Sequence, residues 1–276
     1  MEELNKAYHI ATTGRRGPVL IDLPMNIQRS EVENPVYDMT FEDKHTDAAA
    51  AQQAADTILE ALEQAKRPVI MLGHGVDSSF SQQKLIRFAQ KRQIPIITSV
   101  LAKSVLGYDH PLNFGCIGGA YGHRYANMIA NAKSDLLLCF GISLCTRQIG
   151  TKVHEFARGA KIIRIDIDPY NLQRDIHENG INEVKLQAET GAVIDCLAKA
   201  AAPDTEGISD WLNVCTEIKE NLQAVDDATP ERYPNRMIAV LSDALADTSA
   251  VAVDVGQHMV WSYQSSVSYT HLRAHE

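Results

Sequence analysis

The chain has 276 residues, of which 45% are hydrophobic, and a formal net charge of −9 at pH 7. This length and apolar content are enough for about two packed domains. The acidic balance argues against a nucleic-acid partner, since phosphate-backbone binding needs clustered Lys and Arg. The longest apolar runs fall far short of the about 20 residues of a spanning helix, and no signal segment opens the chain, so we expect no membrane partner and a cytoplasmic location.

The first element that the sequence predicts is a short strand. Residues 14–24 read GRRGPVLIDLP, a turn of Gly and Pro followed by an apolar run that a second Pro ends, which is typical of a buried strand. Residues 31–47 lack periodicity and predict a linker. Apolar residues then recur at three- and four-residue steps over 48–66, which predicts an amphipathic helix with Asp47 as its N-cap.

Four short apolar runs then alternate with helical segments. The runs lie at 68–75, 94–99, 135–141 and 161–168, and the helical segments at about 80–92, 122–132 and 190–202. Runs without in/out alternation are typical of strands covered on both faces, and the alternation of strand and helix predicts a parallel sheet. We therefore predict an α/β fold over residues 48–203, a Rossmann-like parallel sheet with helices on both faces.

Two further units follow in the sequence. Residues 204–233 predict a helical linker, with its helix over about 210–225. Residues 234–266 predict a helix over about 235–246 and a strand over 250–256. Five cysteines form no C-x-x-C pair and ten histidines lack metal-ligand spacing, so we expect no disulfide framework and no metal site on these side chains.

Candidate ligand-binding residues follow the strands, because ligands in parallel sheets bind beyond the carboxyl ends of the strands. Glycines there let a phosphate approach the main chain, and an acid can accept hydrogen bonds from ribose. The glycine-rich segment 115–122 precedes a helix, which favours anions. These residues predict a nucleotide crevice, with ordinary polar turns as the alternative. The candidates are Gly73–Gly75, Thr98–Ser99, Gly141–Ser143, Arg147 and Asp166–Asp168.

Three blocks of the sequence occur in the order found in thiamine-diphosphate-dependent enzymes of the acetolactate synthase type. The segment GRRGPVLIDLP resembles the strand that ends the pyrimidine-binding domain of that family. The segments HPLNFGCIGGAYGHRYAN, SDLLLCFG and KIIRIDIDP resemble its central domain, and VDVGQHMVW is similar to the start of its diphosphate-binding domain. The resemblance covers about residues 4–264. It implies that residues 1–30 and 234–266 are partial cofactor-binding domains on either side of the central one.

The resemblance implies a reaction and a set of cofactors. Family members use thiamine diphosphate and Mg²⁺ to decarboxylate pyruvate and transfer the two-carbon unit to a second 2-oxo acid. The implied thiamine diphosphate contacts are Gly256, Gln257 and His258. The implied contacts to FAD or another nucleotide are Arg15, Gly73, His74, Gly75, Ser99, Val100, Leu101, Gly118, Gly141, Ile142, Ser143, Arg147, Asp166 and Ile167.

The sequence departs from the family pattern at several positions. Ser143 stands where flavin-binding members usually carry Arg, and Asn171 stands where an acid is common. Ala188-Glu189 replaces a frequent Gly-Asp, and Arg16 replaces the usual proline. Because related branches keep the central domain without FAD, three functions remain open. These are a synthase, a non-flavin 2-oxo acid decarboxylase, and a stand-alone nucleotide-binding or regulatory module.

The resemblance also implies what these residues do not include. The glutamate that activates the aminopyrimidine ring belongs to another part of the pyrimidine-binding domain, so no catalytic residue is assigned and the chain alone is expected not to turn over pyruvate. Residues 267–276, VSYTHLRAHE, match no part of the family's next segment and are expected to be a non-native tail. The parent enzyme is expected to be a homo-oligomer, with the acceptor 2-oxo acid and any regulatory subunit left open.

Overall fold

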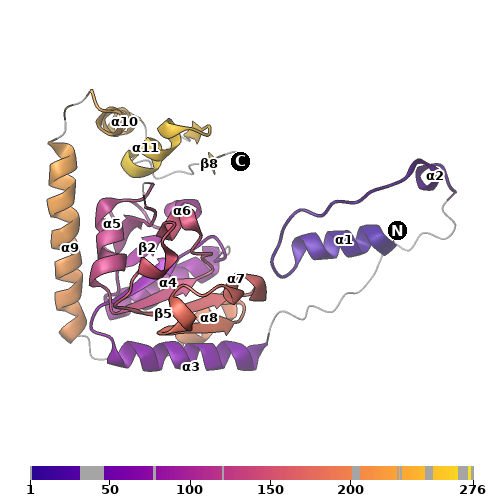
Figure 1. The fold of residues 1–276 in the computed structure, drawn as a ribbon, viewed down its shortest axis with the longest axis horizontal. Coiled ribbons are helices and arrows are strands. Elements are labelled where there is room, and N and C mark those ends of the chain that lie inside the picture. The colour runs from indigo at the N-terminus through magenta and orange to yellow at the C-terminus, as the bar shows by residue number, and fades with distance from the viewer. Residues whose placement is uncertain are drawn as a thin grey trace.

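The computed structural model describes residues 2–31, 47–76, 79–119, 121–200, 206–228, 230, 232–245, 251–266 and 273–274. A six-stranded parallel sheet forms its centre, with helices on both faces (Figure 1). The strands are β1 (Pro68–Leu72), β2 (Ile96–Thr98), β3 (Asn113–Cys116), β4 (Leu136–Phe140), β5 (Lys161–Asp166) and β6 (Glu183–Gln187). Their order is β3-β2-β1-β4-β5-β6, and every neighbouring pair is parallel. This confirms the predicted α/β class.

Two hydrophobic clusters hold the helical layers on the sheet. The first contains side chains of α3 (Ala48–Gln64), α4 (Ser79–Arg92) and α8 (Thr190–Leu197), and the second contains side chains of α5 (Arg124–Met128) and α9 (Glu206–Asp227). Successive residues of β1 alternate between the two clusters, as a strand requires. Both faces of the central strands are therefore apolar, which explains why these strands read as continuous apolar runs.

The helix expected after the linker begins where its cap predicts. The Asp47 carboxylate accepts hydrogen bonds from the N–H groups of Ala49 (2.9 Å) and Ala50 (3.1 Å) at the start of α3. On the other face, Trp211 of α9 donates its indole N–H to the carbonyl of Pro68 (3.0 Å). Lys219 of the same helix donates to the carbonyl of Asn113 (2.9 Å). The helix α9 is thus fixed to two strands of the sheet.

The four strands predicted from sequence are confirmed as β1, β2, β4 and β5, with shorter bounds. The strands β3 and β6 were not predicted, and they are the two edges of the sheet. Half-buried and buried residues alternate along β3, and the residues of β6 are half-buried or exposed, so their sequences, NFGC and EVKLQ, carry no continuous apolar run. The predicted strand 161–168 ends at Asp166 because Asp168 caps the next helix, α7 (Pro169–Gln173).

The predicted helices are also present. The helix α5 continues into a π-helical turn, η2 (Ile129–Lys133), and α8 ends at Leu197, before the predicted end at 202. The remaining short elements around the sheet are η1 (Val100–Val105), α6 (Thr146–Ile149), η3 (Val153–Glu155) and η4 (Glu178–Gly180).

A buried ion pair organises the β5–β6 side of the domain. The Arg164 guanidinium lies 2.7 Å from the Glu183 carboxylate, and their side chains are 2% and 0% exposed. Arg164 also donates to the carbonyls of Asn171 and Arg174, and Arg174 donates to the carbonyl of Ser143 (3.1 Å). The network therefore ties two strands and α7 to the turn after β4.

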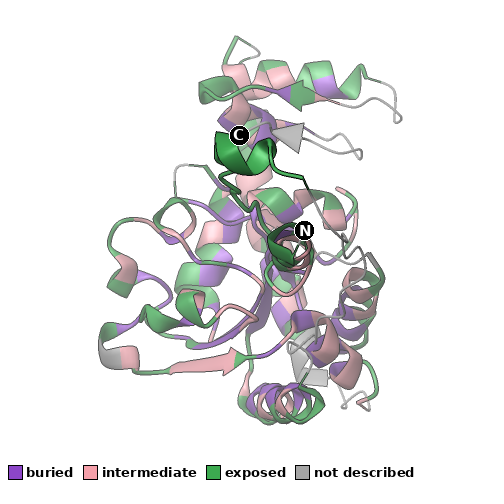
Figure 2. Ribbon diagram, turned by 90° about the vertical axis from the view of Figure 1, so that its right-hand side faces the viewer, coloured by how far each residue is buried: buried purple, intermediate pink, exposed green. Residues whose placement is uncertain are grey.

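The strand predicted within residues 14–24 is wrong. The helix α1 (Glu2–Thr12) precedes this segment and α2 (Met25–Gln28) follows it, while residues 16–24 form no regular element. Leu20 is 95% exposed, and residues 15–24 are all exposed, the class that Figure 2 colours green. A strand needs a neighbour to satisfy its backbone hydrogen bonds, and no described strand pairs with this run.

The last described elements form a small unit beside the sheet domain. The helices α10 (Pro234–Asp243) and α11 (Gln257–Ser265) pack together, and β7 (Ala252–Val253) pairs with β8 (Arg273–Ala274). The predicted helix is thus confirmed and the predicted strand is shorter. Two residues of the expected tail, Arg273 and Ala274, pair with β7, and its non-native origin stays a prediction. Its other residues, and residues 32–46 of the expected linker, lie outside the described residues, and the domain boundaries stay predictions.

Among the helices of the described residues, none combines the length and the apolar content that crossing a lipid bilayer requires.

Candidate functional site

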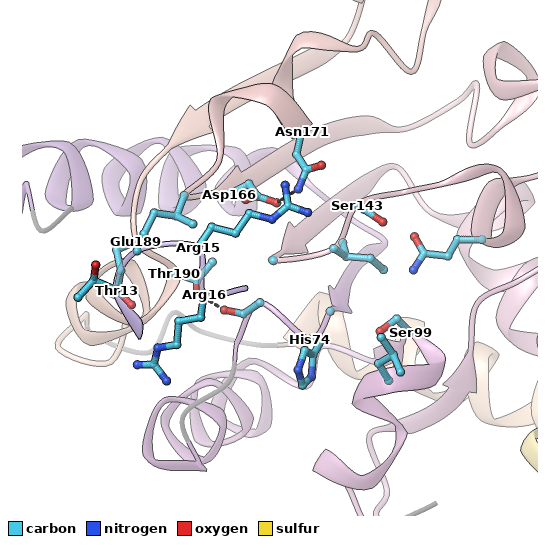
Figure 3. Close-up of a pocket in the computed structure, with 18 of the residues that line it drawn as sticks. Thr13, Arg15, Arg16, His74, Ser99, Ser143, Asp166, Asn171, Glu189 and Thr190 are labelled. Atoms are coloured by element: carbon cyan, nitrogen blue, oxygen red, sulfur yellow. Dashed lines mark hydrogen bonds between the residues drawn. The ribbon is translucent and has the colours of Figure 1, made fainter. Parts of the chain in front are cut away.

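A pocket of about 760 Å³ lies at the carboxyl edge of the sheet. It sits where the strand order reverses between β1 and β4, which is the position where doubly wound sheets bind ligands. Its volume falls within the range of about 300–1,000 Å³ that is usual for small-molecule and cofactor sites. Figure 3 shows the polar side chains that converge on it from several turns.

The floor of the pocket is made by two glycine turns that touch. The Gly75 N–H donates to the carbonyl of Gly141 (2.9 Å), and the Gly73 N–H donates to the carbonyl of Phe140 (2.9 Å). A Cβ atom on Gly73 would lie 2.0 Å from the Gly141 oxygen, and one on Gly75 would lie 2.7 Å from the Gly141 Cα. Glycine is needed here because the two turns pack against each other, which is a different reason from the close ligand approach expected from sequence.

One wall of the pocket carries a fixed carboxylate. Asp166 Oδ1 accepts the N–H of Asp168 (2.9 Å), and Oδ2 accepts the side-chain amide of Asn171 (3.2 Å). Asp168 in turn caps α7 by accepting the N–H of Tyr170 (2.9 Å). Each Asp166 oxygen keeps further lone pairs, so the side chain is held in place yet can still accept from a ligand hydroxyl.

The wall formed by α8 is held to the glycine floor. Thr190 Oγ1 donates to the carbonyl of Gly75 (2.9 Å). The Glu189 carboxylate accepts the N–H groups of Gly191 (3.0 Å) and Ala192 (2.9 Å), which makes it the N-cap of α8. This role explains why a residue with a side-chain acceptor stands before this helix.

The opposite wall comes from the start of the chain. Residues 12–16 line the pocket, and Arg15 forms an ion pair with Asp168. In Figure 3 the Arg15 side chain reaches toward Asp166 and Asn171, whereas Arg16 points the other way. The pocket is therefore closed by residues that lie far apart in the sequence.

Most of the residues predicted for a nucleotide site meet in this pocket. Eleven of the fourteen line it, namely Arg15, Gly73, His74, Gly75, Ser99, Leu101, Gly141, Ile142, Ser143, Asp166 and Ile167. Val100, Gly118 and Arg147 do not line it. Gly118 lies in a glycine loop closed by its own contacts, since its carbonyl accepts the Asn127 side-chain amide (2.8 Å).

Sequence reasoning from strand ends missed several lining residues. These are Thr12, Thr13, Gly14, Gln148 and Thr190, together with Arg16, Asn171 and Glu189, which were noted as departures from the family pattern but not assigned to the site. A signal existed only for Thr190, because a cap residue followed by a helix start marks the turn after β6. Residues 12–14 carry no such signal, since their place depends on how the exposed segment crosses the pocket.

The residues predicted to contact thiamine diphosphate lie elsewhere. Gly256 precedes α11 with a φ of 154°, and Gln257 and His258 form the exposed first turn of that helix. None of the three lines the pocket. Across the described residues, no group of three or more His, Cys, Asp or Glu side chains is placed to hold a metal ion.

The sheet order, the two helical layers and the pocket define a doubly wound α/β domain with a pocket at its switch point. The sequence model of the thiamine pyrophosphate enzyme central domain matches residues 55–197, so the chain belongs to this family. The resemblance stated from the sequence is thereby confirmed at the level of the family.

Acetolactate synthase large subunits are among the relatives that the chain resembles. The chain is 32% identical to "Probable acetolactate synthase large subunit" of Methanocaldococcus jannaschii, over 94% of the chain and 45% of the relative. It is 31% identical to "Acetolactate synthase large subunit" of Corynebacterium glutamicum, over 95% of the chain and 42% of the relative. For the protein of that name in Lactococcus lactis the values are 27%, 95% and 44%. The chain therefore spans less than half the length of these relatives.

Proposed function

We propose that the chain is part of a thiamine-diphosphate-dependent synthase that decarboxylates pyruvate and transfers the two-carbon unit to a second 2-oxo acid. The similarity to acetolactate synthase large subunits runs through 94–95% of the chain, which supports this function over a stand-alone nucleotide module. The observation that carries the site is the pocket that gathers eleven of the expected nucleotide contacts. The synthase activity belongs to the whole protein, and it is tested by acetolactate formation from pyruvate.

The pocket is proposed to bind FAD or another adenine nucleotide. Asp166 would accept hydrogen bonds from ribose hydroxyls, because it follows a strand at the carboxyl edge of the sheet and its orientation is fixed by two donors. Arg15 stands at the same end of the pocket and supplies positive charge for a phosphate. The glycine floor allows a flat ring or a diphosphate to lie across the two turns.

The diphosphate of thiamine diphosphate is proposed to contact Gly256, Gln257 and His258, with Mg²⁺ in the complete site. These residues begin α11, and the N-terminal end of a helix favours anions. Exposure of the first turn leaves its polar groups accessible to such a ligand. When bound, thiamine diphosphate would supply a nucleophilic carbon for the 2-oxo group and a cationic ring that accepts the electron pair left by decarboxylation. The chain's own part is to bind and orient the cofactor.

A second candidate is a non-flavin relative whose pocket binds a smaller nucleotide. Ser143 lines the pocket at a position where flavin-binding relatives usually carry Arg, so one cation for a diphosphate is absent there. Asn171 uses its side-chain amide to hold Asp166, which favours a ribose contact at this end without requiring a flavin.

Titration of the purified chain with FAD and with ADP, by calorimetry, separates these functions. Tight FAD binding supports the flavin-containing synthase, and binding of ADP alone supports the non-flavin relative. Binding of neither nucleotide would contradict a nucleotide site in this pocket. Ser143→Glu is expected to weaken binding at least tenfold by placing a negative charge beside the phosphates. The control Ser30→Glu makes the same change on the exposed segment after α2 and should leave binding unchanged.

A further inference from the structure

A half-buried lysine links the sheet domain to the helix that carries the proposed diphosphate contacts. Lys103 lies on η1, and its ammonium donates to the carbonyls of Tyr263 (2.7 Å) and Ser266 (3.1 Å). These carbonyls belong to the last turn and the C-cap of α11, where backbone oxygens have no partner within the helix. A cation at this end also interacts favourably with the helix dipole. Burial lowers the pKa of Lys103.

The glycine loop holds the same end of α11 from a second side. Gln264 donates its side-chain amide to the carbonyl of Gly122 (3.2 Å), and its backbone is hydrogen-bonded to His123. The His123 Nδ1 accepts the N–H of Cys116 (2.9 Å). Burial lowers the pKa of His123 to about 3, so the ring stays neutral and offers one donor and one acceptor to its two backbone partners.

The helix α11 is too short to be stable by itself. It has nine residues, and isolated helices shorter than about 12–15 residues are marginal in water. Its position therefore depends on packing against α10 and on the contacts at its carboxyl end. Gln257 and His258 lie at the opposite end of the same helix and are exposed, so their location follows from where the carboxyl end is held.

The other end of this link is the pocket. Lys103 lies in the same 3-10 helix as Leu101, which lines the pocket, and Ser99, directly before that helix, also lines the pocket. The element η1 thus has one turn in the nucleotide pocket and the next against α11. The elements η1 and α11 thus connect the proposed nucleotide pocket to the proposed diphosphate contacts.

We propose that Lys103 is a positioning residue that docks the carboxyl end of α11 on the sheet domain and so fixes Gly256–His258 relative to the pocket. The meaning of that position for cofactor binding rests on the proposed function. The docking itself does not, and ligand-free measurements test it separately.

The test compares Lys103→Met with Lys84→Met by amide hydrogen exchange on the full chain without ligands. Lys84 is a matched control, since it is a half-buried lysine on α4 whose ammonium pairs with Asp195 (2.6 Å). In Lys103→Met, amides of α11 are expected to exchange about 10- to 100-fold faster while β1 and β4 stay protected, because charged hydrogen bonds to the helix end are lost. Lys84→Met should leave α11 unchanged. Unchanged exchange of α11 in Lys103→Met would overturn the proposal.

Relaxation measurements separate positioning from a local packing role. Order parameters of the Gly256, Gln257 and His258 amides are expected to fall from about 0.85 toward 0.6 in Lys103→Met. A role confined to the carboxyl end would leave them at the parental value and would overturn the positioning claim.

If amide exchange of β1 and β4 also rises in Lys103→Met, a second variant tests how α11 is held. Gln264→Ala removes, from the side of α11, the contact with Gly122 and the hydrogen bond that the Asn235 amide of α10 donates to Gln264 Oε1 (2.9 Å). We expect exchange of α11 to rise about fivefold with β1 and β4 unchanged. Parental exchange in this variant would show that the carboxyl-end contacts do not hold the helix.

Discussion

Two short apolar runs of this chain differ in structure: one forms a buried strand, and the other is exposed and forms no strand. Residues 136–140, LLLCF, form β4, have parallel neighbours on both sides and are at most 1% exposed. Residues 19–23, VLIDL, form no strand and are exposed throughout. The local sequences are equally strand-like, so the difference lies in the partners. A buried strand is stable because its neighbours satisfy its backbone and cover its side chains.

The largest effect that tests this comparison comes from two ion pairs. One lies inside the sheet domain, and the other joins the exposed segment between α1 and α2 to that domain. Glu183→Gln leaves the buried Arg164 charge without its partner and is expected to lower the free energy of unfolding by about 3–5 kcal/mol. Arg15→Ala breaks the ion pair of the exposed segment and should cost less than about 1 kcal/mol, because the Arg15 side chain is 59% exposed. Urea unfolding followed by circular dichroism measures both losses, and equal losses would contradict the distinction.

The next effect concerns the apolar runs themselves. Leu138→Ala in β4 removes a side chain with no exposed surface and is expected to cost about 2–5 kcal/mol. Leu20→Ala, at 95% exposure, should change the free energy of unfolding by no more than about 0.5 kcal/mol. Thermal unfolding of the two variants is the measurement. A loss above about 1 kcal/mol for Leu20→Ala would mean that the exposed segment is buried in solution.

A smaller effect is expected from two glycines, one in the pocket floor and one on the exposed segment. Gly75→Ala places a Cβ atom 2.7 Å from the Gly141 backbone, and overpacking of this kind costs about 1–3 kcal/mol. Gly17 has no atom within 4 Å of the corresponding position, so Gly17→Ala should stay within about 0.5 kcal/mol. Chemical denaturation resolves the pair. The same stability in both variants would show that the two glycine turns can separate at little cost.

The last effect, small per pH unit, is a dependence of stability on pH that originates in the buried region. Because burial lowers the pKa of His123 to about 3, the unfolded chain binds one more proton than the folded chain between pH 3 and about 6.5. The stabilisation that comes from keeping His123 neutral is complete above pH 6.5 and is lost as pH falls. The free energy of unfolding then changes by up to about 1.4 kcal/mol per pH unit. His123→Asn should flatten this slope in urea unfolding between pH 7 and 4. Leu20→Ala, which removes no titratable group, should keep it.

The sequence predicted the interior of the fold better than its borders. The strands β1, β2, β4 and β5 are buried on both faces, so their sequences are mostly apolar, with Arg164 of β5 as a buried charged exception. The strands β3 and β6 have one covered edge each, carry partly exposed side chains, and so resemble loops in a single sequence. For residues 19–23 the apolar pattern was present without the partners, and the prediction failed for that reason.

For the candidate site, the strand ends located the pocket but not its walls. Gly73, Gly141 and Asp166 were found because the carboxyl ends of parallel strands meet at one edge. Residues 12–14 and Gln148 were not found, since their place depends on long-range packing that no local pattern encodes. The physical role of the floor glycines also differed, because the space beside them is filled by backbone of the neighbouring turn.

The contact between Arg15 and Asp168 joins positions 153 residues apart. Closing so long a loop costs chain entropy that an exposed ion pair barely offsets, so this wall should be among the last parts to assemble and the first to detach. A nucleotide bound behind it would hold the wall closed. Occupancy would then be visible as slower tryptic cleavage after Arg15 and Arg16, with no label attached to the ligand.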